Sequence, residues 1–404
     1  MTTARTSEWR KLPVSLTELC IDTTLRCGQS FRWRRSDDGI WSCALRGRIL
    51  SLRQDAQHLY YRSVCPNPAT LPTPPATPSV TDEDDDTLEL IEHYFNLKPN
   101  LGQLYDEWAT ADLNFRRKAP KFTGVRILKQ DAWEALVGFI CSSNNNIARI
   151  SQMVEKLCLN YGPYVGTIDS KPYHDFPSPS TLVGPKVEEH LRKLGFGYRA
   201  KYLHQTAKLV AQERGEGWLE DLRNPESSLR PQPNQSAGEM VEGGREGYRK
   251  AHEELLNLQG VGPKVADCVC LMGLGWGEAV PVDTHVWQIA QRDYKFGKGK
   301  HSSLTKATYD GVANKFRALW GKEAGWAHSV LFTADLKVFA ERLVAKKEEH
   351  IVEVKVEDEG VTTVVATRET KEKLVKRGFE EAEYPSVKIE ETTARRTSKR
   401  RKRT

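Results

Sequence analysis

A short segment with two glycines, at residues 258–264, places the tightest constraint on what this chain can fold into. It reads Leu-Gln-Gly-Val-Gly-Pro-Lys and ends at Lys264. The glycines, Gly260 and Gly262, favour a tight turn whose backbone amides can face an anion. Pro263 suits the first position of a helix, and the two turns after Lys264 contain no further Gly or Pro. The segment therefore predicts a hairpin between two helices, with an anion site for a nucleic-acid phosphate where the second helix begins.

Lys264 is a candidate nucleophile in this hairpin. Burial and the helix N-terminus both disfavour the ammonium form, so we expect Lys264 to supply a fraction of free amine. Asp283 lies in a Pro-Val-Asp-Thr-His run and is expected to cap the next helix and to stay ionised. An amine and a fixed carboxylate suit attack at a sugar C1′, where positive charge develops as a base departs. The alternative is a non-enzymatic DNA clamp in which Lys264 only contacts phosphate, but the presence of Asp283 favours catalysis.

Five segments that occur in order carry a family resemblance. They are residues 27–33, 139–149, 195–200, 260–268 and 324–332. With them the chain resembles the eukaryotic 8-oxoguanine DNA glycosylase/lyases of the helix-hairpin-helix superfamily, over about residues 8 to 343. The resemblance implies an α+β fold, with an N-terminal antiparallel β-sheet domain carrying helices, followed by an all-α helix-hairpin-helix domain.

The same resemblance implies a base-excision-repair activity. The expected substrate is damaged double-stranded DNA with 8-oxoguanine, or a related oxidised purine such as formamidopyrimidine-guanine, opposite cytosine. Base removal is expected to be followed by β-elimination at the abasic site through a Schiff base on Lys264. Two alternatives stay open at this point, namely a glycosylase for another oxidised or alkylated base and a lesion-binding protein without turnover.

The charge of the chain is concentrated at its end. The 404 residues carry a formal net charge of +6, and residues 391–404 contain seven Lys or Arg and one Glu. Residues 1–390 are therefore formally neutral, so DNA affinity of the folded part must come from local patches and helix ends. The absence of a run of eighteen apolar residues predicts no membrane span.

The cysteines restrict the cofactors. Eight are present, none in a Cys-x-x-Cys pair, which predicts reduced thiols in an intracellular protein. Bacterial relatives with an iron–sulfur cluster carry four cysteines after the catalytic domain, whereas the last one here, Cys270, precedes Asp283, which excludes that cluster. We expect no organic cofactor. The resemblance also implies a monovalent or calcium ion on hairpin carbonyls near Leu256, Leu258 and Val261.

Hydrophobic periodicity and turn residues predict the elements. The expected strands form an antiparallel meander of residues 31–35, 41–45, 49–53 and 58–62. The expected helices are residues 88–95, 101–110, 130–141, 147–160, 248–258, 265–272, 284–292, 303–320 and 325–346. We expect an N-terminal α/β domain over residues 1–118, with a Pro-rich and acidic insertion at 66–86. A helix-hairpin-helix domain over 119–345 would carry a flexible insertion at 224–247, and a charged tail without fixed structure would cover 346–404.

Four residues are expected to line the pocket for the extruded base. By resemblance, Cys268 packs against one face of the base, opposite Phe332, although by pattern alone both fit ordinary core positions. Gly28 matches the residue whose carbonyl reads N7–H, which 8-oxoguanine has and guanine lacks; its bland alternative is a turn glycine. His328 stands where the family has a glutamine that binds the Watson–Crick edge. Because an imidazole offers its donor and acceptor on opposite edges, we expect recognition of that edge to be weaker or pH-dependent.

The DNA around the lesion has its own expected contacts. Asn144, Arg149 and Arg199 match donors to the cytosine left behind, and Tyr198 matches the wedge that enters the emptied stack. His285 matches a residue near the lesion phosphate, beside the backbone amides of Gly260 and Gly262. The alternatives are a helix cap or turn for the asparagines, a surface pair for Tyr198 and Arg199, and a first-turn helix histidine for His285. Gln259 replaces the usual hairpin proline, which loosens one turn.

The end of the chain, residues 395–403, is a basic cluster. It predicts recognition by the nuclear import machinery or a non-specific DNA arm. We therefore expect a nuclear protein, and a monomer. Residues 1–11 carry too little positive charge to predict mitochondrial import.

Overall fold

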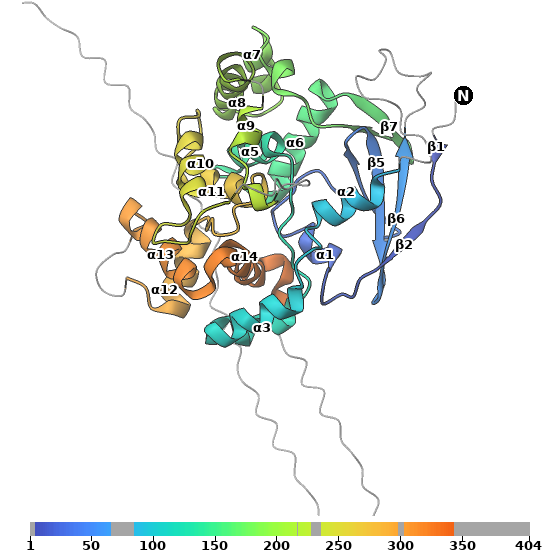
Figure 1. Ribbon diagram of the computed structural model, residues 1–404. Helices are drawn as coiled ribbons and strands as arrows, with labels where there is room; N and C mark the ends of the chain where they lie inside the picture. Colours follow the sequence, from blue (N-terminus) through green and yellow to red (C-terminus); the bar gives the residue numbers. More distant parts are fainter. Residues whose placement is uncertain (1–4, 66–84, 216, 228–235, 298–302, 343–404) are drawn as a thin grey trace, which may run out of the picture. The chain divides into compact units, whose positions relative to one another are not determined.

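The computed structural model describes residues 5–65, 85–215, 217–227, 236–297 and 303–342 (Figure 1). Residues 66–84 of the first expected insertion, residues 228–235 of the second, and the whole tail with its basic cluster lie outside the described residues. Among the helices that are described, none is long and apolar enough to cross a membrane.

An antiparallel sheet dominates the N-terminal part. It comprises β1 (Arg5–Thr6), β2 (Arg10–Pro13), β3 (Arg34–Arg35), β4 (Trp41–Leu45), β5 (Arg48–Gln54) and β6 (His58–Cys65). The order is β1-β6-β5-β4-β3, and β2 also pairs with β6. Apolar side chains of the sheet, such as Leu50, Leu52 and Leu59, pack against Leu90 and Ile91 of the helix α2 (Thr87–Tyr94), because alternate strand residues share one face. Figure 1 shows α2 beside the sheet.

Helices make up most of the remainder. They are α1 (Ile21–Thr24), α2 (Thr87–Tyr94), α3 (Leu101–Ala111), α4 (Leu113–Lys118), α5 (Ala132–Ser142), α6 (Ile147–Tyr161), α7 (Val187–Lys193), α8 (Arg199–Lys208), α9 (Trp218–Asp221), α10 (Glu246–Leu256), α11 (Pro263–Met272), α12 (Thr284–Tyr294), α13 (Lys306–Trp320) and α14 (Ala324–Asp335). A second sheet of two strands, β7 (Tyr164–Ile168) and β8 (Lys171–His174), follows α6. The expected α+β class, with a sheet domain followed by helices, is confirmed.

Two helices, α5 and α11, form the centre of the helical part. Residues 132–141 of α5 are all buried, as are residues 265–272 of α11. The two helices approach closely at Gly273, where an added Cβ would lie 3.0 Å from the Cβ of Ala135. Because α11 carries Lys264 at its exposed N-terminal end, the core fixes the helix from which the candidate nucleophile projects.

The structure differs from the sequence prediction at several elements. The first expected strand is wrong over residues 31–33, because Arg32 turns into the protein and donates to Glu134, at 2.7 Å, and to the Ala44 carbonyl. The helix expected over 325–346 is wrong over residues 336–342, where Leu336 adopts an extended backbone and a 3₁₀ segment follows, and its last residues, 343–346, lie outside the described residues. The acidic end of the first insertion is ordered at Asp85 and Asp86, which pair with Arg10 and Arg48.

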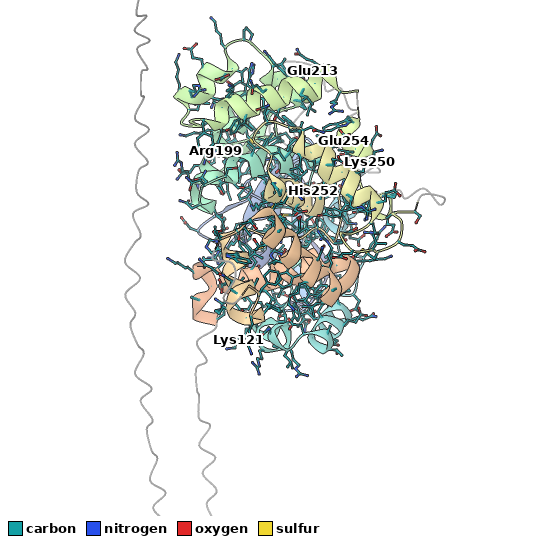
Figure 2. The ribbon with its side chains drawn as sticks, turned by 90° about the vertical axis from the view of Figure 1, so that its left-hand side faces the viewer. Lys121, Arg199, Glu213, Lys250, His252 and Glu254 are labelled. Atoms are coloured by element: carbon teal, nitrogen blue, oxygen red, sulfur yellow. The ribbon has the colours of Figure 1, made fainter. Side chains whose placement is uncertain are left out.

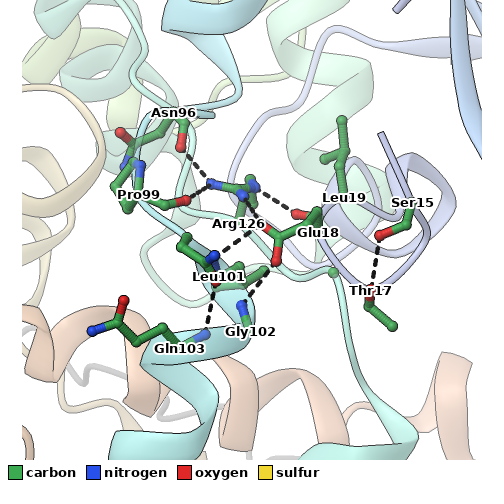
Figure 3. A network of polar contacts seen from close by, with 12 residues as sticks. Ser15, Thr17, Glu18, Leu19, Asn96, Pro99, Leu101, Gly102, Gln103 and Arg126 are labelled. Atoms are coloured by element: carbon green, nitrogen blue, oxygen red, sulfur yellow. Dashed lines mark hydrogen bonds and ion pairs between the residues drawn. The ribbon is translucent and has the colours of Figure 1, made fainter. Parts of the chain in front are cut away.

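A buried arginine, Arg126, fixes the segment of residues 126–130, which bonds to Gln29 beside the candidate site (Figure 3). Its guanidinium donates to the Glu18 carboxylate at 2.6 Å and to the Asn96 carbonyl at 2.6 Å. The same carboxylate accepts backbone N–H bonds from Leu101 and Gly102, at 3.0 and 2.9 Å, where the positive end of α3 favours an anion. The network fixes residues near 126 against two distant stretches of the chain.

Candidate active site

A cavity with an empty volume of about 450 Å³ opens beside the start of α11. Its wall combines residues from the N-terminal part, the hairpin helix and the last helix. The lining residues are Cys27, Gly28, Gln29, Phe139, Lys264, Cys268, Met272, Pro281, Asp283, Val286, His328, Ser329, Phe332 and Thr333. All the residues that were expected to bind the base, and both expected catalytic residues, therefore meet in one cavity.

Lys264 follows directly after Pro263, which occupies the first helical position of α11 as predicted. The ammonium nitrogen Nζ lies 3.5 Å from the Ser142 hydroxyl, to which it donates. Nζ also lies 5.2 Å from the centroid of the Phe139 ring. A half-buried lysine between a hydroxyl and an aromatic face is held at the cavity wall instead of moving freely in solvent.

Asp283 is the N-cap of α12, as predicted, and its carboxylate accepts the Val286 N–H at 2.9 Å. Burial favours the neutral acid, but the neighbouring His285 imidazole, the hydrogen bond from Val286 and the charge of Lys264 outweigh it, so the pKa of Asp283 is lowered. The His285 Nδ1 lies 3.8 Å from Asp283 Oδ2, and this carboxylate raises the pKa of His285. Asp283 therefore stays ionised in the cavity.

Cys268 lies one helical turn after Lys264 and faces the same cavity. Burial raises the pKa of its thiol to about 11, although Lys264 acts in the opposite direction. The thiol is therefore neutral near pH 7, which suits a packing surface and not a nucleophile. Phe332 is partly buried and lines the cavity as well.

Gly28 has a φ of +83°, and a Cβ at this position would lie 3.1 Å from Ile147 Cδ1. Its neighbour Gln29 fixes the turn, since the Gln29 amide donates to the Arg126 carbonyl at 2.8 Å and accepts the Leu128 N–H at 2.9 Å. The Gln29 carbonyl accepts a bond from Gln130 at 2.9 Å. The backbone at Gly28 is thus clamped to residues 126–130, which a carbonyl that reads a base requires.

His328 forms a buried part of the cavity wall, with its ring 6.0 Å from Phe316 and 6.4 Å from Phe332, centroid to centroid. In the part of the chain that the structure describes, neither ring nitrogen has a hydrogen-bond partner. Burial lowers the pKa of His328 to about 4, against the opposing charge of Asp283. The imidazole is therefore neutral from pH 6 to 8, which speaks against the expected pH dependence of edge recognition in that range.

We expect the stability of the protein to fall in acid because of His328. The unfolded chain takes up a proton below pH 6.5, whereas the folded chain does so only near pH 4, so unfolding becomes easier as the pH falls between these values. The difference amounts to roughly 2 kcal/mol between pH 6.5 and 5. Urea unfolding of wild type and His328→Gln across this range measures it. If the difference in unfolding free energy between wild type and His328→Gln does not change with pH, the lowered pKa is not that of His328.

The loop after α5 is in contact with Tyr198 and Arg199, two of the residues expected to contact DNA. Tyr198 is 46% exposed, and its hydroxyl donates to the Ser143 carbonyl at 3.1 Å. Arg199 is buried and donates to the carbonyls of Ser143 and Asn144, with its guanidinium 4.5 Å from the Tyr198 ring. Asn144 and Arg149 are exposed, and Asn144 has a φ of +47°. In this conformation Arg199 orders the loop, while Asn144, Arg149 and Tyr198 face solvent.

The hairpin itself forms the predicted turn. Gly260 has a φ of +78°, and an added Cβ would collide with Tyr202 of α8, so this position requires glycine. The Gln259 carbonyl accepts a bond from Thr206 at 3.1 Å, which secures the turn despite the missing proline. Carbonyls at the end of α10 and in the turn, at Leu256, Leu258 and Val261, lie where a helix leaves acceptors for an ion. A cation there would be held by backbone oxygens, and the described residues contain no cluster of three His, Cys, Asp or Glu side chains suited to a metal.

Sequence reasoning did not single out Ser142, Phe139 or Gln29. Ser142 and Phe139 belong to the 139–149 segment and Gln29 to the 27–33 segment, so the motifs contained them. Their roles depend on distances to Lys264 and to residues near 126, which only the folded chain brings together.

Comparisons with known proteins agree with this geometry. Residues 11–136 match the family model of the 8-oxoguanine DNA glycosylase N-terminal domain, and residues 137–315 match that of the HhH-GPD superfamily of base-excision DNA repair proteins. The fold and the lysine-bearing cavity thus define a helix-hairpin-helix DNA glycosylase of the lyase type. The chain belongs to the 8-oxoguanine DNA glycosylase/lyase family, as the resemblance predicted.

Relatives from yeast and plants cover most of the chain. An N-glycosylase/DNA lyase of Saccharomyces cerevisiae is 34% identical over 357 residues, covering 81% of this chain and 86% of the relative. The N-glycosylase/DNA lyase OGG1 of Arabidopsis thaliana is 35% identical over 337 residues, covering 82% and 81%. A solved structure, MBOgg1 in complex with a low-affinity DNA ligand, superposes with a TM-score of 0.62 at 25% identity, covering 82% of this chain and 98% of that one.

Proposed function

We propose that this chain removes 8-oxoguanine from duplex DNA and cleaves the resulting abasic site, with Lys264 as nucleophile and Asp283 as electrostatic partner. The activity follows from the family, whose relatives are N-glycosylase/DNA lyases, and this favours an enzyme over a lesion-binding protein without turnover. The single observation that supports the residue roles is that Lys264 and an ionised Asp283 line the same cavity.

The proposed reaction has two steps. The free amine of Lys264 attacks C1′ of the flipped nucleotide while the Asp283 carboxylate stabilises the positive charge that develops on the sugar. The C1′–N bond breaks, the base leaves with the electron pair, and the sugar ring opens to a Schiff base on Lys264. The Schiff base accepts electrons, so a proton is lost from C2′ and the 3′ phosphate leaves by β-elimination. A cation on the hairpin carbonyls at Leu256, Leu258 and Val261 would strengthen the grip on a phosphate.

We propose that two parts of the cavity wall select the base that is removed, namely the Gly28 carbonyl and the side chains of the helical part. The Gly28 carbonyl accepts the N7–H that 8-oxoguanine carries and repels the N7 lone pair of guanine. Cys268 and Phe332 enclose the ring, and His328 offers one neutral ring nitrogen as donor or acceptor to its edge. The same carbonyl suits formamidopyrimidine-guanine, which also carries a hydrogen on this nitrogen.

The opposite strand is proposed to be read by the loop after α5. Asn144 lies in this loop, Arg149 in the first turn of α6 and Tyr198 at the start of α8. All three are exposed, and Tyr198 is a flat side chain that can fill an emptied stack. Arg199 holds the loop through carbonyl bonds and becomes a donor to cytosine only if these bonds exchange. The backbone amides of Gly260 and Gly262, with His285, would contact phosphate.

Single-turnover excision on 8-oxoguanine opposite each of the four bases tests the proposal. We expect the fastest excision opposite cytosine and a covalent adduct after borohydride reduction. A duplex panel with other oxidised or alkylated bases tests the competing substrates. Faster excision of one of these bases, or nicking without a trapped adduct, would refute the proposed substrate or mechanism.

We also propose that the basic cluster at residues 395–403 directs the protein to the nucleus. The proposal is supported by the concentration of positive charge in this cluster, whereas residues 1–390 are formally neutral. Deletion of residues 391–404 from the full chain, with a fluorescent fusion of the deleted and intact forms, should lower the nuclear fraction several-fold. An unchanged distribution would show that the cluster serves another purpose.

A further inference from the structure

A buried polar network lies between α10, α11 and α13, outside the lining of the cavity. At its centre is Asp267, fully buried, which lies one residue before Cys268 and three after Lys264. Its carboxylate accepts hydrogen bonds from two tyrosine hydroxyls, those of Tyr248 on α10 and Tyr309 on α13. His252, also on α10 (Figure 2), has its Nε2 3.7 Å from the carboxylate. None of these groups has a role in the reaction proposed above.

The two tyrosine hydroxyls also accept bonds, and their donors differ. The Tyr248 hydroxyl accepts from the Arg317 guanidinium at 2.8 Å. The Tyr309 hydroxyl accepts from the backbone N–H of Val282 at 3.3 Å. Since each hydroxyl receives one donor and has one proton to give, the pattern suits an ionised Asp267, which only accepts. The Tyr248 branch of the network therefore ends at the side chain of Arg317, whereas the Tyr309 branch ends at the backbone N–H next to Asp283.

We propose that Tyr309 is a positioning residue that sets the separation between Lys264 and Asp283. Its hydroxyl joins Val282, the residue before Asp283, to Asp267 on the helix that carries Lys264. All three residues of the connection, Val282, Tyr309 and Asp267, are buried, so water competes weakly for these bonds. The inference rests on the roles proposed for Lys264 and Asp283.

The position of Asp283 affects the rate because its charge stabilises the sugar cation only when the carboxylate lies close to C1′. A displacement of about 1 Å in a reacting group can slow a reaction on the order of 10²-fold. Loss of the Tyr309 hydroxyl removes the acceptor of the Val282 N–H and frees the segment 281–283 to shift. An interaction used only in the transition state changes the rate constant and leaves substrate binding unchanged.

Tyr309→Phe in the full chain tests the proposal, with Tyr248→Phe as matched control. Both variants remove one hydroxyl from the same carboxylate, but only Tyr309 contacts Val282. For Tyr309→Phe we expect single-turnover excision at saturating enzyme to fall about 10-fold or more. Affinity for the lesion duplex, and borohydride trapping on a preformed abasic site, should stay within about two-fold. For Tyr248→Phe, excision should stay within about three-fold of wild type.

The outcomes separate three cases. The inference is overturned if Tyr309→Phe excises the base at the wild-type rate, or if both variants lose the same amount of excision activity. A parallel loss of excision, duplex affinity and trapping in Tyr309→Phe marks a general structural role and overturns it as well. Failure of the wild-type protein itself to form a trapped adduct refutes the proposed mechanism instead.

Discussion

Lys264→Gln is expected to abolish excision of 8-oxoguanine, with a rate lowered by more than about 10³-fold, and to remove the borohydride-trapped adduct. Glutamine is polar and one bond shorter than lysine, so the fold should remain, but its amide nitrogen cannot form a Schiff base. Single-turnover assays and reduction with borohydride measure both effects. Binding of the lesion duplex should be retained, since the hairpin amides are unaffected.

Lys250 supplies the control for this experiment. It is an exposed lysine of the neighbouring helix α10, labelled in Figure 2, and it does not line the cavity. Lys250→Gln removes the same charge from the protein, so it corrects for weaker electrostatic attraction to DNA. Excision and trapping should both persist in this variant. Trapping that survives in Lys264→Gln would remove Lys264 from its proposed role.

Asp283→Asn should lower the excision rate about 10²- to 10³-fold while the protein stays folded. Asparagine caps helices as well as aspartate does, so the bond from Val286 and the start of α12 should be kept. What disappears is the negative charge beside the forming sugar cation. On a preformed abasic site no base has to leave, and the loss of lyase activity should be smaller. Equal losses on both substrates would show that Asp283 acts mainly through structure.

Most of the candidate site could be predicted because its chemistry sits in short segments. Pro263 and Asp283 have the helix positions that their residue types favour, and these positions fixed the two catalytic assignments. The support for the Gly28 turn could not be foreseen, because Gln29 bonds to Arg126 and Leu128, about a hundred residues away. The state of His328 depends in the same way on burial, which a sequence position does not reveal.

The fold was predictable where periodicity is strong and elements are long. Strand β4 matches the prediction residue for residue, and α3 and α6 agree within one residue at each end. The hairpin of β7 and β8 was missed because its turn residues, Asp169 and Ser170, adopt φ values of +49° and +61° without a glycine. Non-glycine residues rarely adopt this conformation, so Asp169-Ser170 is a weaker turn signal than a pair that contains glycine.

The hydrogen bonds of Gln29 fix one wall of the cavity separately from the wall that carries the reacting groups. The amine and the carboxylate come from helices of the C-terminal part, whereas the carbonyl at Gly28 comes from the N-terminal part and is held by one side-chain amide. Substitutions around residues 27–29 or 126–130 can therefore change which base is accepted without altering the reacting groups. In such a protein the range of lesions can evolve while the chemistry of strand cleavage stays constant.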